Sequence, residues 1–219
     1  MPTPDVSAEA AAEPPRDCPL CPRLVAYRVA NAQAHPDWWN GPAPSFGDRN
    51  ARLAVVGLAP GRMGANRTGR PFTGDFAGVL LFETLLKLGF AHGRYEARPD
   101  DGLQLRDCLI TNAVRCAPPG NKPETAEENA CRPFLSARLD QMPNLKVIVT
   151  LGDVSRRNVL KALGLKASAG VGGHGSEFKA GPYTVINSYH CSRLNTNTGR
   201  LTPAMFEDIF VRARELISA

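Results

Sequence analysis

Six cysteines are the residues of this 219-residue chain whose spacing most directly bears on chemistry. Cys18 and Cys21 form a C-x-x-C pair, whereas fourteen residues separate Cys116 from Cys131. Four thiolates can hold either a tetrahedral zinc ion or an iron-sulfur cluster, because both accept an all-cysteine ligand set. Free buried cysteines are a third alternative. The spacing alone leaves these three alternatives open, and the other two cysteines have no evident partner.

A glycine-punctuated, basic segment at residues 57–75 is the second candidate for chemistry. It follows one short apolar run and precedes another, so it is expected to leave a buried strand and enter a helix. Ligands of open α/β sheets bind at such loops. The segment offers arginines, the ring of Phe72 and the carboxylate of Asp75. A nucleotide-binding α/β enzyme is a weak alternative, because G-L-A-P-G lacks the dinucleotide fingerprint and the phosphate-loop lysine.

The elements that must position these residues alternate between strand and helix. Apolar runs predict four buried parallel strands, at 53–56, 108–113, 146–151 and 183–188. Helical patterns follow them at 79–88, 125–141, 154–163 and 203–217. In the last helix we expect Thr202 as the N-cap. This alternation predicts a single α/β domain, with a central four-stranded parallel sheet flanked by helices.

The two ends of the chain and its glycine-rich segment are read from composition. Residues 1–17 are rich in Ala, Pro and Glu, which predicts a disordered tail before a domain at 18–219. A further helix is expected at 20–34, and the adjacent Trp38 and Trp39 are expected to cover a core edge. The segment 164–181 predicts a flexible loop or a β-hairpin.

Charge and hydropathy narrow the choice of partner and compartment. The formal net charge is +5, and most of the positive side chains are arginine, which binds phosphate in two-pronged fashion. Nucleic acid is therefore a reasonable partner. No apolar run is long enough to span a bilayer and no secretory signal pattern is visible, so no membrane association and a cytoplasmic location are expected.

Four separated motifs together resemble the iron-sulfur uracil-DNA glycosylases of families 4 and 5. The first two are the amino-terminal C-x-x-C and the segment T-N-A-V-R-C-A-P-P at 111–119, which is followed by a cysteine in the next helix. The segment 57–75, with G-L-A-P-G and G-R-P-F-T-G-D, is similar to motif one of family 5. The segment 190–202 is similar to motif two of that family. The resemblance covers residues 18–217.

The resemblance implies a cofactor, a substrate and a reaction. It implies a structural 4Fe-4S cluster on Cys18, Cys21, Cys116 and Cys131. It further implies a monomeric, nucleoid-associated enzyme that flips uracil, and other deaminated bases such as hypoxanthine and xanthine, out of DNA and hydrolyses the N-glycosidic bond. Neither motif contains lysine, so no lyase step is expected. A non-catalytic iron-sulfur or zinc nucleic-acid-binding module is the alternative from another class.

The resemblance also assigns roles around a base pocket. The substrate-binding residues are expected to be Gly57, Leu58, Ala59, Phe72, Asn112 and His190. Phe72 would stack on the base and Asn112 would read its edge. His190 would stabilise charge on the leaving base. Because Leu58 and Ala59 carry no polar group, the second catalytic role falls on Asp75, which can also serve as a helix N-cap.

The expected DNA contacts lie in both motifs. They are Arg62, Arg67, Ser192, Arg193, Leu194, Asn195, Gly199 and Arg200. Leu194 is the expected wedge that fills the vacated stack. Cys191 and Arg193 stand where prolines are common in motif two of the family, so this loop is expected to be less rigid.

Overall fold

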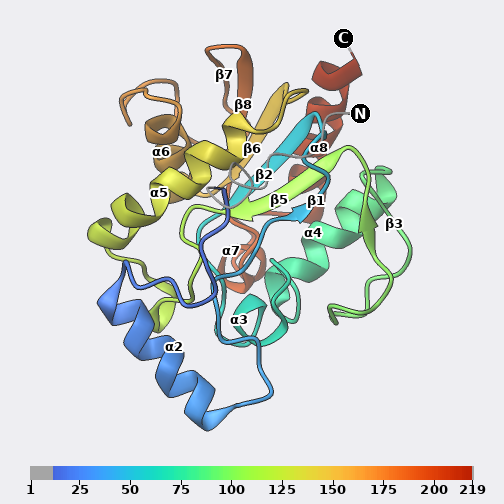
Figure 1. Cartoon of the computed structure of the whole chain (residues 1–219). Coiled ribbons are helices and arrows are strands. Elements are labelled where there is room, and N and C mark those ends of the chain that lie inside the picture. The colour runs from blue at the N-terminus through green and yellow to red at the C-terminus, as the bar shows by residue number, and fades with distance from the viewer. Residues whose placement is uncertain (1–11, 219) are drawn as a thin grey trace, which may run out of the picture.

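A six-stranded, mostly parallel sheet forms the centre of the computed structural model, which describes residues 12–218 (Figure 1). Its strand order is β1-β5-β2-β6-β8-β7. The parallel strands are β5 (Cys108–Asn112), β2 (Leu53–Gly57), β6 (Val147–Leu151) and β8 (Tyr183–Ser188). The prediction of four parallel strands is confirmed. The sheet also has two antiparallel edge strands. The sequence did not reveal β1 (Phe46–Gly47), whereas β7 (Glu177–Ala180) lies in the segment for which a hairpin was one alternative.

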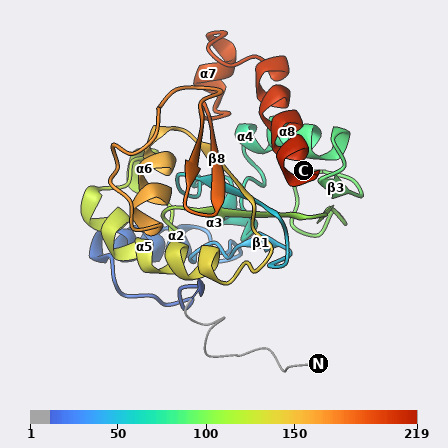
Figure 2. The ribbon, with the colours of Figure 1, turned by 90° about the horizontal axis from the view of Figure 1, so that it is seen from above.

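Helices cover both faces of the sheet (Figure 2). One face packs against α4 (Phe76–Lys87) and α8 (Pro203–Ser218), and the other against α5 (Thr125–Asp140) and α6 (Asp153–Ala162). Alternate residues of β2 divide between these two cores: Leu53 and Val55 face the first, and Ala54 and Val56 face the second. Both faces are buried, which explains why the parallel strands are continuous apolar runs.

The last helix follows the sequence prediction closely. Met205 N–H donates to Thr202 Oγ1 at 3.2 Å, so Thr202 caps α8 as expected. Phe206, Ile209 and Phe210 are buried on its inner face. This packed face anchors the chain directly after the motif-two segment, which we define as residues 190–202.

Shorter elements connect this framework. They are α2 (Pro22–Ala34), α3 (Ala65–Thr68), the 3-10 turn η1 (Pro119–Asn121), α7 (Arg193–Asn197) and a two-stranded sheet of β3 (Ala91–His92) and β4 (Gln104–Leu105). Strands β7 and β8 form a hairpin, so the end of the segment 164–181 takes the hairpin alternative. Among the described residues, no helix is both long and apolar enough to cross a membrane.

The packed part of the chain begins before the first cysteine. Residues 1–11 of the predicted tail lie outside the described residues, but residues 12–17 pack against the domain. Ala12 is fully buried. The Glu13 carboxylate forms ion pairs with Arg115 at 3.1 Å and with Arg138 at 2.9 Å. Ala12 and Glu13, which composition assigned to the tail, therefore contact the domain predicted to begin at Cys18.

Candidate active site

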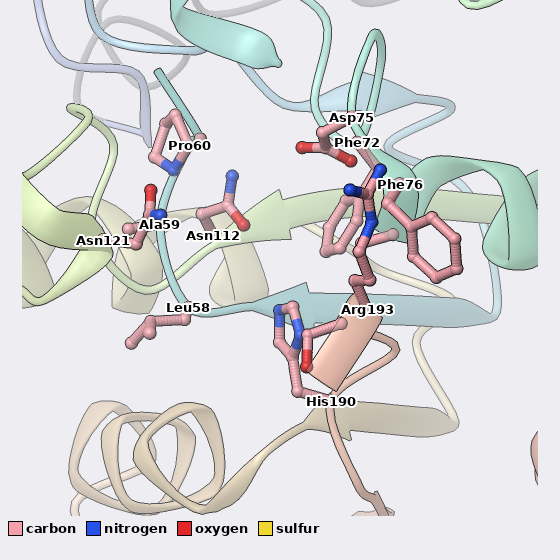
Figure 3. Close-up of a pocket in the computed structure, with 13 residues that line it drawn as sticks. Leu58, Ala59, Pro60, Phe72, Asp75, Phe76, Asn112, Asn121, His190 and Arg193 are labelled. Atoms are coloured by element: carbon pink, nitrogen blue, oxygen red, sulfur yellow. The ribbon is translucent and has the colours of Figure 1, made fainter. Parts of the chain in front are cut away.

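A pocket of about 340 Å³ opens at the carboxyl ends of β2 and β5 (Figure 3). Its wall is completed by the motif-one segment, which we define as residues 57–75, by the start of α4 and by the segment after β8. Its lining residues are Leu58, Ala59, Pro60, Gly61, Phe72, Asp75, Phe76, Ala77, Asn112, Asn121, His190, Ser192 and Arg193. Five of the expected substrate-binding residues and both expected catalytic residues thus share one cavity, and Gly57 directly adjoins it.

Gly57 allows two side chains to approach the end of β2. It pairs in register with Asn112 of the neighbouring strand. A Cβ atom at Gly57 would lie 2.4 Å from Asn112 Oδ1 and 2.5 Å from Phe72 Cζ, so no other residue fits without displacing both. Asn112 is buried, and its Oδ1 has no hydrogen-bond partner among the described residues. A buried acceptor without a partner costs about 1–3 kcal/mol, and a ligand N–H would recover that cost.

Phe72 forms one wall of the pocket in a constrained conformation. Its φ is 54°, in the left-handed region that non-glycine residues rarely adopt. The Tyr95 hydroxyl donates to Phe72 O at 3.2 Å. The same carbonyl lies so close to Gly78 that a Cβ there would come within 1.7 Å. The Phe72 ring centroid lies 6.3 Å from that of His190, so these two rings bracket the cavity.

A buried ion pair holds the segment that carries Phe72. Arg70 donates to both carboxylate oxygens of Asp101, at 2.8 Å and 2.7 Å, and to Thr73 Oγ1 at 2.7 Å. Burial alone would raise the pKa of Asp101, but the Arg70 guanidinium and the backbone N–H groups of Glu96 and Leu103 lower it well below its usual range. The segment between β3 and β4 therefore anchors the wall of the pocket.

Asp75 is both a helix cap and a pocket residue. Gly78 N–H donates to its Oδ1 at 3.0 Å, so the predicted N-cap role is confirmed. Its Oδ2 faces Gly61 and Gly64, and a Cβ atom at Gly64 would lie only 2.3 Å from it. Burial raises the pKa of Asp75, although hydrogen bonds from backbone N–H groups of Gly78 and Ala77 oppose that effect.

His190 enters the pocket from the segment that follows β8. Burial lowers its pKa, so the imidazole is neutral at pH 7 and retains one N–H donor. Asn195 Nδ2 donates to the backbone carbonyl of His190 at 2.8 Å. The Asn195 side-chain amide is therefore directed at the His190 backbone and not outward from the protein.

The remaining residues of the motif-two segment form a short helix beside the pocket. Ser192 caps α7, because its side chain accepts from Asn195 N–H. Leu194 is 72% exposed, as a wedge requires. Arg200 lies over the Tyr189 ring at 4.5 Å, and Gly199 adopts a φ of 69° where the helix ends.

Two of the three motif-one arginines, Arg62 and Arg67, do not line the pocket. Arg62 donates to Asn31 Oδ1 at 2.7 Å and lies over the Trp38 ring at 5.2 Å, so it joins the motif-one segment to the end of α2. Arg67 is exposed, and its backbone carbonyl accepts from Trp39 N–H at 3.0 Å. Arg62, which was expected from the sequence to contact DNA, therefore contacts other residues of the protein instead.

Five residues that line the pocket were not among the expected site residues: Pro60, Gly61, Phe76, Ala77 and Asn121. Asn121 reaches it from η1, where Gly120 and Asn121 both have positive φ values, of 63° and 57°. The P-P-G-N sequence after Cys116 signals such a turn. For Pro60 and Phe76, the sequence offered no sign of a role in the pocket except that each adjoins a recognised motif residue.

The four candidate ligand cysteines line one small cavity between α2, the loop after β5 and α5. Leu24, Val114 and Phe134 supply its apolar wall. Among residues 12–218, no three His, Cys, Asp or Glu side chains are placed to hold a metal ion. The four thiols therefore share a cavity without meeting around a single point.

Polar groups surround these thiols. Arg115 N–H donates to Cys131 Sγ at 3.3 Å, and the Arg28 guanidinium lies 3.8 Å from Cys116 Sγ. Burial raises the pKa of Cys116 to about 12 and that of Cys131 to about 11. Cations and N–H donors directed at buried sulfurs are the groups that stabilise cluster thiolates.

Comparison with known proteins places these features in one family. Residues 44–214 match the model of the uracil DNA glycosylase superfamily. A type-5 uracil-DNA glycosylase of Thermus thermophilus is 43% identical over 205 residues, which are 91% of this chain and 93% of the relative. A type-5 enzyme of Pyrobaculum aerophilum is 43% identical over 201 residues, 90% of this chain and 88% of the relative.

Relatives of the type-4 group match less well. A type-4 uracil-DNA glycosylase of Pyrobaculum aerophilum is 33% identical over 153 residues, 69% of this chain and 64% of the relative. The type-5 relatives are thus more similar and match over a greater length. On this evidence, the chain belongs to the type-5 uracil-DNA glycosylases of the uracil DNA glycosylase superfamily.

Proposed function

We propose that this uracil-DNA glycosylase, a hydrolase, removes deaminated bases in general, hypoxanthine and xanthine as well as uracil, and leaves an abasic site. The observation that carries this proposal is the buried Asn112 Oδ1, which has no partner among the described residues. Deamination converts the ring nitrogen acceptor of cytosine or adenine into an N–H donor. A fixed acceptor therefore favours uracil over cytosine, and hypoxanthine over adenine, by about 1–3 kcal/mol.

The apolar part of the pocket explains why several bases are accepted. Leu58 and Ala59 offer no side-chain hydrogen bond that only one base could satisfy. A cavity of about 340 Å³ leaves room for a second ring. The shared N–H group would then discriminate against cytosine and adenine, while Phe72 stacks on any flipped base.

Two side chains divide the chemical step. As the glycosidic bond breaks, negative charge moves onto the base, and the neutral His190 N–H donates to the base oxygen on which that charge gathers. Asp75 Oδ2 accepts a proton from the attacking water, which adds to the anomeric carbon of the sugar. Asp75 Oδ1 remains bonded to Gly78 N–H, so the helix cap holds the carboxylate in place.

DNA is held by the motif-two segment and by Arg67. Ser192, Arg193, Asn195 and Arg200 lie on or beside α7, and Leu194 projects from that helix as the wedge. The enzyme is expected to act as a monomer in the cytoplasm, where it meets the nucleoid, and both expectations stay predictions.

The cysteine cavity fits a 4Fe-4S cluster. Cys18, Cys21, Cys116 and Cys131 would hold it, with Arg28 and the Arg115 N–H directed at two of the sulfurs. Such a cluster would cross-link α2, the loop after β5 and α5, and it would take no part in the hydrolysis. The protein purified without oxygen should be brown and contain iron, whereas a colourless zinc protein would contradict the assignment.

The substrate proposal is tested with duplexes that carry one uracil, hypoxanthine, xanthine, cytosine or adenine, followed by alkali to cleave abasic sites. We expect the first three bases to be excised faster than cytosine and adenine. In Asn112→Leu, the ratio of uracil to cytosine excision should fall roughly 5- to 100-fold. An unchanged ratio would show that Asn112 does not read the base.

The catalytic assignment is tested with Asp75→Asn, which keeps an oxygen for the helix cap. Single-turnover excision of uracil should slow by roughly 10²- to 10⁴-fold while DNA affinity is retained. Because burial raises the pKa of Asp75, wild-type activity should fall on the acidic side at a pH above the usual 3.8 of an aspartate. Excision by Asp75→Asn at the wild-type rate would remove Asp75 from the mechanism.

A further inference from the structure

An exposed aromatic ring stands at the mouth of the pocket. Phe76 is the first residue of α4, directly after Asp75, and its side chain is 39% exposed although it also lines the cavity. Val79, one turn further along the same helix face, is 42% exposed. Exposed apolar side chains grouped beside a binding pocket mark a contact with a partner.

This surface is continuous with the motif-two segment. The Arg193 guanidinium lies 5.1 Å from the centre of the Phe76 ring, and Arg193 lines the pocket as well. Leu194, the most exposed large apolar side chain among the described residues, is the next residue in the chain. The start of α4 and α7 therefore meet at the mouth of the pocket, where the Phe76 ring lies beside Arg193 (Figure 3). Leu194, the aliphatic wedge, follows Arg193 on α7.

Flipping a nucleotide creates two kinds of unstacked base. The base opposite the lesion loses its partner, and the bases on either side of the lesion lose a stacking neighbour. An aliphatic wedge fills volume but has no π-face, whereas an aromatic ring stacks on any base. The phosphate of a bound duplex also competes for the Arg193 guanidinium, and loss of that contact would free a face of the Phe76 ring.

We propose that Phe76 is a second duplex probe, which stacks on a base left exposed when the lesion leaves the helix and so gives the enzyme a preference for double-stranded over single-stranded substrate. This inference rests on the proposed glycosylase function, and it adds a residue that determines whether duplex or single-stranded DNA is preferred. A single strand has no opposite base and no intact stack to restore, so the ring gains less there than in a duplex. If Phe76 instead contacted the flipped nucleotide itself, it would raise the excision rate equally for duplex and single-stranded substrates.

The test compares uracil excision from a duplex and from the same strand alone, under single-turnover conditions. In Phe76→Ala, the ratio of duplex to single-strand rate should fall roughly 5- to 100-fold, the contribution of one base–aromatic stack. Phe76→Leu, which keeps apolar bulk without a ring, should lower the ratio by a similar amount. Val211→Ala, which alters another exposed apolar residue on α8, is the matched control and should leave the ratio unchanged.

The ratio separates the possible outcomes, because a loss of folded protein lowers both rates together. An unchanged ratio in Phe76→Ala overturns the inference even if both rates fall. Wild-type protein that excises uracil from neither substrate would overturn the glycosylase function itself.

A duplex with an abasic site opposite the uracil then identifies the base on which Phe76 stacks. If the variant effect disappears there, the ring stacks on the opposite base, and if it persists, the ring stacks on a flanking base.

Discussion

The buried pair of Arg70 and Asp101 makes a quantitative prediction about how the pocket wall is held. The Asp101 side chain is 0% exposed and that of Arg70 is 6% exposed, with 2.7 Å between Nη2 and Oδ2. Asp101→Asn removes the negative charge and leaves the guanidinium buried without a counter-charge. Breaking a buried pair in this way costs about 3–5 kcal/mol, a large part of the 5–15 kcal/mol that stabilises a typical domain.

Urea unfolding of the wild type and of Asp101→Asn measures this cost. Glu207→Gln is the matched control, because the Lys87–Glu207 pair has the same 2.7 Å separation but its lysine side chain is 65% exposed. An exposed pair contributes about 1 kcal/mol or less. Asp101→Asn should therefore be several-fold more destabilising than the control. It should also slow uracil excision, because Phe72 and Asp75 lie on the segment that Arg70 anchors, and a misplacement of about 1 Å can cost roughly 100-fold.

The pH dependence supplies a second readout of the same pair. The folded-state pKa of Asp101 lies below its unfolded value, so its contribution is complete above an ordinary aspartate pKa of about 3.9 and is lost as the pH falls toward the folded value. The difference between wild type and Asp101→Asn should be constant from pH 8 to about 5 and shrink below about 4. If Asp101→Asn lowers the free energy of unfolding at pH 7 by no more than Glu207→Gln does, the Arg70–Asp101 pair does not hold the pocket wall in this way.

Two further predictions concern the cofactor region and the pocket. Glu13→Gln should lower the free energy of unfolding by about 3–5 kcal/mol in urea, because its carboxylate pairs with two buried arginines, of which Arg115 lines the cysteine cavity. A loss below about 1 kcal/mol would contradict this role. Since burial lowers the pKa of His190, the uracil excision rate should show no loss from its protonation between pH 8 and 6.5. An acid limb centred above pH 6.5 that disappears in His190→Asn would show that the imidazole is not held neutral.

The fold was largely predictable because its core is built from apolar runs that alternate with amphipathic helices. The edge strand β1 was not, because Phe46–Gly47 is only two residues long. Strand β7 was left open between a loop and a hairpin. Its polar Glu177 and Lys179 are exposed, whereas Ala180 on the other face is buried. Glu13 was assigned to a tail by composition, since no local pattern shows that a carboxylate will meet arginines more than a hundred residues away.

Within the site, motif resemblance brought Phe72, Asn112, Asp75 and His190 together, and the structure places all four around one cavity. Their roles stay predictions. The sequence did not predict the backbone conformation of pocket residues or the contacts between side chains far apart in the chain. The left-handed backbone of Phe72 depends on contacts with residues of other segments, and the Arg62 side chain reaches back to α2, 31 residues earlier in the chain.

The placement of Trp38 and Trp39 determines what the chain's own fluorescence can report. They are its only tryptophans, and their rings lie against Arg62, His35 and Arg16 at the end of α2 rather than in the wall of the base pocket. Intrinsic emission should therefore respond to the docking of α2 on the motif-one segment and stay nearly constant when a free base enters the pocket. A fluorescent base analogue in the DNA is the appropriate probe of flipping, and tryptophan emission provides an independent signal for the end of α2.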